Sequence, residues 1–177
     1  MKKSILLVAI MLIGTLSTVN AQKFAGLQKS PTDISYAKKD RSAKPEIKVV
    51  YSRPQKKGRQ IFGNLAAYDK VWRTGADEAT EIKFFQDVKM GDKTVKAGTY
   101  SLFTIPGEKE WTIILNSDLD SWGAYTYDES KDVARIKVPA ASGEELEVFS
   151  IAFKKVDKGY HMVMGWDKAR VEVPFYL

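Results

Sequence analysis

The chain has 177 residues, with 28 Lys or Arg, 22 Asp or Glu and no Cys, so its formal charge is +6. The absence of Cys excludes disulfides, thiolate chemistry and attachment of a lipid through cysteine. Residues 51–177 hold nineteen basic and nineteen acidic side chains. This neutral balance argues against nucleic-acid binding, which requires a basic face.

The first 21 residues have the pattern of a secretory signal peptide. Lys2 and Lys3 precede an apolar run over 5–16, and the small residues Val19 and Ala21 suit cleavage after Ala21. The run is too short to cross a bilayer comfortably. We therefore predict export to the periplasm or the extracellular space, and a soluble mature chain without a transmembrane span.

Residues 22–45 form a basic segment that we expect to be a flexible arm. Residues 22–50 carry seven Lys or Arg against three acids, which gives a charge of +4. Such an arm could touch an anionic membrane or a glycan surface. A solvated tether is the simpler interpretation, because charged segments that contain proline usually stay mobile.

Alternation of apolar and polar side chains with period two, typical of β-strands, recurs from residue 46 to the C-terminus. The sequence "GDKTVKAGTY" predicts a short hairpin, and "PGEKE", "PAASGEE", "DKG" and "DKA" have the composition of turns. The predicted strands are 46–52, 80–90, 99–106, 111–116, 132–138, 146–156, 160–166 and 169–177.

These elements predict an all-β domain of about eight or nine strands with little helix. The expected architecture of residues 46–177 is a single antiparallel β-sandwich, jelly-roll-like, or a flattened barrel. The chain contains eight Phe, eight Tyr and four Trp, which suit a two-layer core because aromatic side chains pack well on pleated surfaces.

The sequence lacks the motifs of catalysis and cofactor binding. It has one histidine, His161, inside a predicted strand, whereas zinc usually takes several His or Cys ligands. No phosphate loop, dinucleotide fingerprint or Gly-x-Ser-x-Gly elbow occurs. The carboxylate-rich stretch 118–129 lacks the ligand spacing of an EF-hand, so a solvated turn is preferred to a calcium site. We predict no metal and no cofactor.

The segment between the first two predicted strands is long for a compact β domain, and long loops often carry function. Arginine suits carboxylates, and aromatic faces suit sugar rings. One hypothesis is therefore a pocket for an anionic or saccharide ligand. Its residues in this segment would be Arg53, Arg59, Tyr68, Trp72 and Arg73.

A second hypothesis makes the same segment structural. Arginines and carboxylates in one loop most simply satisfy each other. Arg53, Arg59 and Arg73 would then pair with the three acids that end the segment and begin the next strand. These acids are Asp77, Glu78 and Glu81.

Several phrases of the sequence resemble the domain-of-unknown-function family 2911, a family of exported bacterial proteins. The resemblance runs from about Leu27 to the end and implies a single β-rich domain with no established activity. The family usually has Asn at the position of Asp77 and commonly Pro at that of Ala67. A turn would accept either Asn or Asp, whereas an amide contact to a ligand would be altered. The phrases are "KSPTDISYAK", "YSRPQKKGRQIFG", "VWRTGADEATEIKF", "KAGTYSLFTIPGEKEWTIILN", "WGAYTYDESKDVARIKV" and "VPFYL".

Three functional hypotheses follow. The preferred one is a non-enzymatic binding or envelope-interaction module with a site for an anionic or saccharide ligand. The second is a hydrolase acting on an envelope polymer, with Glu78 and one of Asp77, Glu81 or Asp132 as acid and base. The third is a purely structural envelope protein. The candidate ligand-binding residues are Arg53, Arg59, Tyr68, Trp72, Arg73, Asp77, Glu78, Trp122 and Tyr125.

Overall fold

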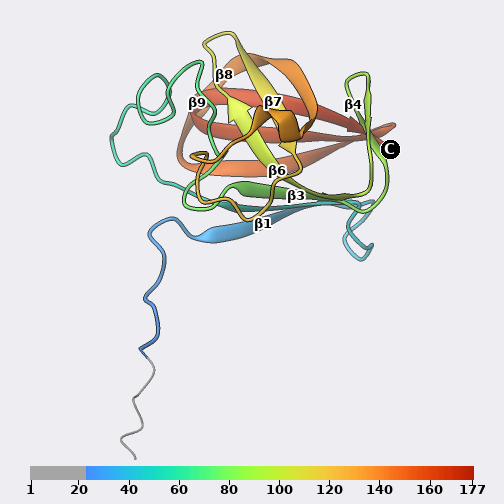
Figure 1. Cartoon of the computed structure of the whole chain (residues 1–177), viewed down its shortest axis with the longest axis horizontal. Helices are drawn as coiled ribbons and strands as arrows, with labels where there is room; N and C mark the ends of the chain where they lie inside the picture. The colour runs from blue at the N-terminus through green and yellow to red at the C-terminus, as the bar shows by residue number, and fades with distance from the viewer. Residues whose placement is uncertain (1–22) are drawn as a thin grey trace, which may run out of the picture.

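The computed structural model describes residues 23–177, and the predicted signal peptide over 1–21 lies outside them. The described residues form nine strands and one short 3-10 helix (Figure 1). Within residues 23–177 no helix could span a membrane. The strands are β1 (Thr32–Ala37), β2 (Ile47–Ser52), β3 (Thr80–Phe84), β4 (Val88–Met90), β5 (Lys93–Val95), β6 (Gly98–Ile105), β7 (Glu110–Asn116), β8 (Asp132–Val156) and β9 (Gly159–Tyr176), and the helix is η1 (Glu129–Lys131).

The strands pair antiparallel in the order β1-β2-β3-β6-β7-β8-β9-β4-β5. β8 pairs with β7 as far as Pro139 and with β9 from Ala140 onward. It therefore carries the chain from one layer, which contains β1, β2, β3, β6 and β7, into a second layer with β9, β4 and β5. The predicted all-β, sandwich-like fold is confirmed.

Between residues 132 and 177 the four predicted strands are in fact two long ones, β8 and β9. The sequence "PAASGEE", predicted to be a turn, continues β8 because Ser142 pairs with Ala169. The pairing of β8 with β9 shifts its register after Ser142 and again after Leu146. Inside β9, Asp167 has a positive φ of 50°. Cross-strand pairing thus overrides the local turn composition.

The strand predicted over 80–90 is interrupted after Phe84. In the break, the Asp87 carboxylate accepts hydrogen bonds from the Ala97 N–H at 2.9 Å and from Lys96 Nζ at 2.8 Å. The chain leaves the first layer here and enters the β4–β5 hairpin of the second layer.

The segment predicted to be a flexible arm contains a strand. β1 pairs with β2 along its whole length, from Thr32 opposite Ser52 to Ala37 opposite Ile47. The sheet therefore begins before residue 46, and residues 32–37 are a strand rather than part of an arm. The described residues that precede β1, from 23 onward, run away from the two layers (Figure 1).

The main core lies between the two layers and follows the alternation of the strands. Ile47 and Val49 of β2 are buried, as are Val171, Val173 and Phe175 of β9. These parts of β2 and β9 therefore turn every second side chain inward, as a half-buried strand must.

A smaller cluster lies on the opposite face of the first layer. Leu102 belongs to the main core, whereas its neighbour Phe103 packs with Ile114 and Ala79 in this second cluster. Ala124 and Tyr127 pack against the cluster. The loop after β7 is therefore held against the outside of the sheet, where it builds part of one candidate site.

Candidate functional site

The connection between β2 and β3 is anchored by Trp72. The backbone N–H of Trp72 donates to the Thr104 carbonyl at 2.7 Å, and the backbone N–H of Thr104 donates back to the Trp72 carbonyl at 2.9 Å. The indole is 8% exposed and packs against Trp111, Trp166 and Phe149. Trp72, a predicted ligand-binding residue, therefore lies in the core.

Arg53 is engaged by the protein itself. Its guanidinium donates to Asp33 Oδ2 at 2.9 Å, to Ser150 Oγ at 2.8 Å and to the Phe149 carbonyl at 3.2 Å. These partners lie on β1 and β8, so the side chain links the two layers.

Arg59 is engaged locally, by the carbonyl oxygens of Gln55 and Lys56. The predicted clasp of Arg53, Arg59 and Arg73 by Asp77, Glu78 and Glu81 is absent. Of the Arg and Lys side chains in residues 23–177, none forms a salt bridge with these three carboxylates. The hypothesis of an internal network was wrong in its partners, although it was right that Arg53 is structural.

Arg73 differs from the other two arginines. Within the described residues, its Nε is the one buried side-chain nitrogen or oxygen without a hydrogen-bond partner. The backbone around it is fixed, because the Thr80 N–H donates to the Arg73 carbonyl at 3.1 Å. A buried donor without an acceptor is unfavourable, so the Nε–H of Arg73 lowers the stability of the fold rather than adding to it.

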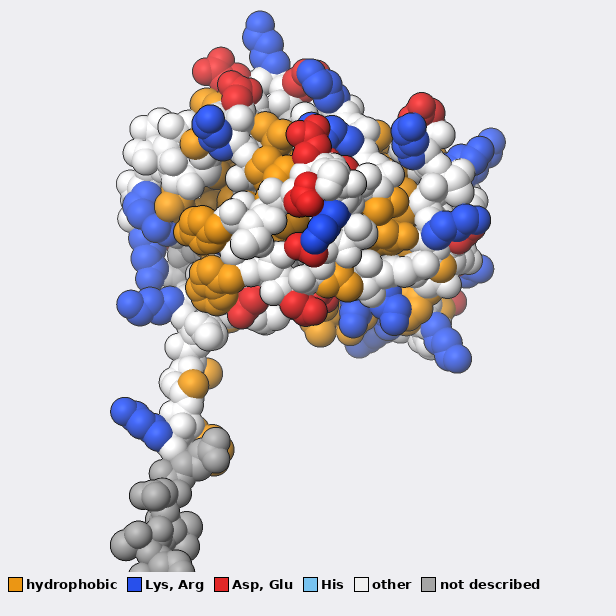
Figure 2. Space-filling view, in the orientation of Figure 1, with side chains coloured by type: hydrophobic (Ala, Val, Ile, Leu, Met, Phe, Trp, Pro, Cys, Tyr) orange, Lys and Arg blue, Asp and Glu red, His pale blue; other side chains and the backbone are white. Residues whose placement is uncertain are grey.

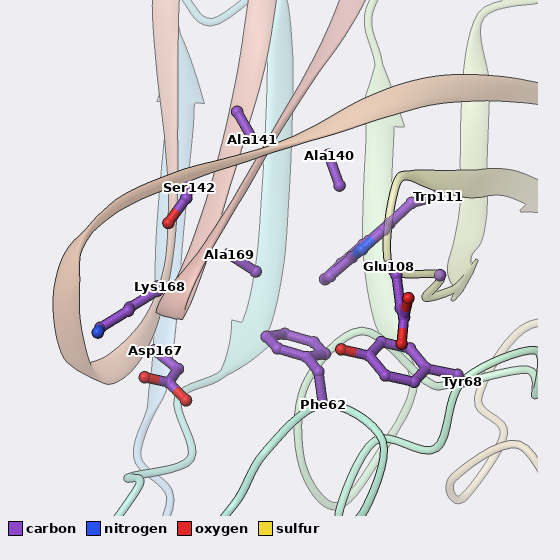
Figure 3. Close-up of a pocket in the computed structure, with 11 residues that line it drawn as sticks. Phe62, Tyr68, Glu108, Trp111, Ala140, Ala141, Ser142, Asp167, Lys168 and Ala169 are labelled. Carbon is purple, nitrogen blue, oxygen red and sulfur yellow. The ribbon is translucent and has the colours of Figure 1, made fainter.

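A cavity of about 350 Å³ opens beside this connection, and we call it the aromatic cavity (Figure 3). Phe62, Tyr68 and Trp111 form its apolar wall. In Figure 3 the Phe62 ring and the Tyr68 hydroxyl point into the same space. The polar lining residues are Glu108, Ser142, Asp167 and Lys168.

The aromatic wall is held rigidly by its neighbours. The Phe62 ring lies 4.9 Å from that of Trp111 and 6.2 Å from that of Trp72. At Gly63, where φ is +82°, an added Cβ would lie 2.9 Å from Tyr68 Cε2, so the tyrosine ring covers the glycine closely. This packing presents the rings at little further cost in conformational entropy.

The polar groups of the aromatic cavity differ in their availability. Asp167 accepts from Lys56 Nζ at 2.8 Å and is therefore already paired. Glu108 and Lys168 form no ion pair with the described residues. A carboxylate and an ammonium group thus remain free to bind polar groups of a ligand.

A second cavity, of about 260 Å³, lies where the loop after β7 meets β2 and β3, and we call it the outer acidic cavity. Its carboxylates are Glu78, Glu81 and Asp120. Backbone hydrogen bonds join its two loops, from the Ala79 N–H to the Ser121 carbonyl at 2.9 Å. Asp120, which follows Glu78 and Glu81 by about forty residues in the sequence, therefore shares one cavity with them.

Two exposed aromatic side chains lie on the loop after β7. Trp122 is 60% exposed and Tyr125 is 83% exposed. The loop is fixed by the Gly123 N–H, which donates to the Asp77 carbonyl at 3.0 Å, and by a bridge between Glu78 and Trp122. The tertiary structure thus brings together four predicted site residues, Asp77, Glu78, Trp122 and Tyr125, but keeps them apart from Trp72 in the core and Tyr68 in the aromatic cavity.

Asp77 occupies a tight turn, with a φ of +60°. Asn and Asp tolerate this left-handed conformation better than other residues that have a side chain. The observation supports the turn interpretation of this position.

Two carboxylates of the stretch 118–129 are engaged within the fold. Asp118 pairs with Lys131, and Asp128 caps η1 by accepting from the Ser130 N–H at 2.9 Å. No group of three or more metal-binding side chains occurs within residues 23–177. In the view of Figure 2, positive and negative side chains are interspersed, with apolar side chains between them.

Sequence reasoning missed Glu108, Trp111, Ser142 and Lys168 as site residues. They come from the β6–β7 turn, the start of β7, the middle of β8 and the bend of β9. Their spacing along the chain carries no local signal. Phe62 is different, because it lies in the long connection between β2 and β3 that the sequence had already indicated as a candidate site.

Comparison with known proteins places most of the chain in one sequence family. A family model with the description "Protein of unknown function (DUF2911)" matches residues 30–175. No curated protein and no solved structure matches the chain.

Proposed function

We propose, from the premise that the chain belongs to the DUF2911 family of proteins of unknown function, that it is a non-enzymatic saccharide-binding module. The observation that carries the proposal is the aromatic cavity, in which the rings of Phe62 and Tyr68 lie beside the carboxylate of Glu108, unpaired among the described residues, with Lys168 at the opposite edge of the lining. Aromatic faces stack on sugar rings, and the polar groups hydrogen-bond to hydroxyls. The cavity volume lies in the range of small-molecule sites.

A saccharide is a better match to this cavity than a simple anion. Arg53 and Arg59 donate to protein oxygens and do not line the cavity. The lining carries two acids, Glu108 and Asp167, against one base, Lys168. Because Asp167 is paired with Lys56, the charges of Glu108 and Lys168 balance, so an anion gains no net attraction, whereas a neutral sugar can hydrogen-bond to both groups.

The binding experiment uses the chain from Gln22 onward and a panel of neutral and anionic oligosaccharides, with affinity measured by calorimetry. We expect at least one neutral saccharide to bind, and Tyr68→Ala to weaken binding about tenfold, which corresponds to about 1.4 kcal/mol of lost contact. Glu108→Gln should weaken binding as well. Tyr36→Ala, at an exposed tyrosine of β1, is the matched control and should bind normally.

Binding that survives both Tyr68→Ala and Glu108→Gln unchanged, in folded variants, would contradict the assignment of this site. A panel without any binder would favour the purely structural envelope protein.

Export is part of the same proposal, because a saccharide-binding module would meet its ligand in the cell envelope. Its support is the signal pattern of residues 1–21. N-terminal sequencing of the protein recovered from the exported fraction should give Gln22 as the first residue. Recovery of the intact N-terminus from the cytoplasm alone would contradict export.

A hydrolase is the second candidate function, and its support is the outer acidic cavity. Glu78 and Glu81 line one open cavity and neither is paired with a described cation. Asp132 is a poor member of such a pair, because it already binds Tyr127 and Arg135. Release of reducing ends from a glycan, lost in both Glu78→Gln and Glu81→Gln, would establish this function, and the same release from the double variant would exclude it.

A further inference from the structure

A third cavity, which we call the β8–β9 cavity, lies where the first-layer part of β8 meets β9 of the second layer, and it has no residue in common with the aromatic cavity. Its volume is about 720 Å³. It lies between the β4–β5 turn and the strands β8 and β9, which Figure 1 shows side by side. Its apolar lining residues are Ile136, Val138, Pro139, Pro174 and Tyr176.

The turn at Gly91 closes one side of this cavity. A Cβ added to Gly91 would lie 2.9 Å from Ile136 Cγ2, so the turn backbone is in close contact with the isoleucine. The φ of Gly91 is +64°, a conformation that suits glycine. The apolar wall is therefore formed by regular strands and one tightly packed turn.

The charged groups of the β8–β9 cavity are mostly basic. Lys137, Lys154, His161 and Glu172 line it, so two lysines face one glutamate and the formal charge is +1 with a neutral histidine. Glu172 is already engaged, because its Oε1 lies 2.7 Å from His161 Nδ1 and 3.6 Å from Lys154 Nζ. The lining of the cavity thus combines an apolar wall with more lysine than carboxylate side chains.

The two lysines can change partners at little cost. Lys137 pairs with Glu110, which lies outside the cavity, and both side chains are more than half exposed. Lys154 is 67% exposed and its contact with Glu172 is long. Exposed pairs of this kind contribute little to stability, so an incoming anion can replace the carboxylates.

We propose that the β8–β9 cavity binds a single-tailed anionic amphiphile. The carboxylate of such a ligand lies against Lys137 and Lys154, and its hydrocarbon chain lies along Ile136, Pro139 and Pro174. Charge complementarity selects the head group, and burial of apolar surface supplies the larger part of the affinity.

The test is a titration of the chain from Gln22 onward with decanoate below its micelle concentration, followed by NMR chemical shifts of the backbone amides. We expect saturable shifts at Lys154, His161 and Glu172. Decanol, which has the same chain length and no charge, should bind at least tenfold more weakly. The double variant Lys137→Gln, Lys154→Gln should weaken decanoate binding about tenfold.

Lys83→Gln, which removes one charge from β3 in the other layer, is the matched control and should bind decanoate normally. All of these lysines are on the surface, so the variants are expected to fold. Equal binding of decanol and decanoate, shifts confined to another part of the chain, or undiminished binding by the double variant would each overturn the proposal. Because the aromatic cavity shares no residue with this one, failure here leaves saccharide binding unaffected.

Discussion

Arg53 of the connection after β2 lies 2.9 Å, through Nη1, from Asp33 Oδ2 on β1. The same guanidinium donates to Ser150 Oγ and to the Phe149 carbonyl on β8. One side chain therefore joins the strand at the edge of the first layer to the long strand that enters the second. A residue that the sequence singled out as a ligand contact is a link between the layers.

Arg53→Ala should lower the free energy of unfolding by about 1.5–3 kcal/mol, because it leaves Asp33 and the Phe149 carbonyl without a charged donor. Urea denaturation measures the change. Arg59→Ala is the control and should change the free energy by less than about 0.5 kcal/mol, since Arg59 is exposed and bonds only within its own loop. Equal losses in the two variants would contradict the special role of Arg53.

Arg73→Met should raise the free energy of unfolding by up to about 1 kcal/mol, because it removes a buried N–H that has no acceptor while keeping the length of the side chain. The same urea denaturation measures it. A loss of more than about 1.5 kcal/mol would mean that Arg73 makes a stabilising contact in solution.

Trp72→Ala should lower the free energy of unfolding by about 3–5 kcal/mol, because it opens a cavity among packed aromatic rings. Thermal and urea unfolding both report the loss. Trp122→Ala, at an exposed tryptophan of the same protein, should change the free energy by less than about 0.5 kcal/mol. A large destabilisation by Trp122→Ala would show that its ring packs against the fold.

Asp77→Asn should be neutral, whereas Asp77→Val should cost about 1–3 kcal/mol, because a β-branched side chain is strained at a φ of +60°. Asp77→Gly should be close to wild type for the same reason. Unfolding of the three variants under identical conditions checks the order. Equal losses in Asp77→Asn and Asp77→Val would mean that the carboxylate of Asp77, rather than its tolerance of a positive φ, stabilises the fold at this position.

Ionisation of Tyr127 makes the free energy of unfolding depend on pH in the alkaline range. Burial, followed by its hydrogen bond to Asp132, raises the pKa of Tyr127 to about 12, above the usual tyrosine pKa of about 10. Below about pH 10 the Tyr127 phenol is neutral in the folded protein and in the unfolded chain, so its contribution to the free energy of unfolding is complete. Between these two values the unfolded chain ionises first, so this contribution is lost as the pH rises.

Tyr127→Phe should therefore show a smaller fall in unfolding free energy than wild type between about pH 10 and 12. Tyr125→Phe, at an exposed tyrosine two residues away, provides the comparison and should follow the wild-type pH dependence. Parallel curves for wild type and Tyr127→Phe would contradict the raised pKa.

Strand alternation was enough to predict the fold class. Residues such as Ile47 and Val49 repeat with period two because one face of β2 is buried. The same logic failed at "PAASGEE" and at "DKA", where turn composition is tolerated inside β8 and β9. Pairing of Ser142 with Ala169 supplies backbone hydrogen bonds that local composition does not reveal.

β1 was missed for a related reason. Ile34 and Tyr36 alternate with polar residues, but both are partly exposed and the segment around them is rich in lysine. Pairing with β2 stabilises this strand, and such pairing depends on a partner rather than on the segment itself.

The candidate site was predicted only in part. The long connection after β2 was identified correctly as unusual, and Tyr68 does line the aromatic cavity. The roles of Arg53 and Trp72 could not be predicted, because a charged or aromatic side chain in a loop can face a ligand or the core with the same local sequence.

The all-β class, the absence of cysteine chemistry and the membership of a family without an assigned activity all follow from the order of the amino acids. These properties depend on composition, on local periodicity and on long matching phrases. Three relationships appear only in the tertiary structure: Arg53 links two layers, Glu78, Glu81 and Asp120 share a cavity, and Tyr68 lines one cavity together with Trp111 and Lys168. Those relationships join segments far apart in the chain, and antiparallel pairing between distant strands, rather than any local pattern, brings them together.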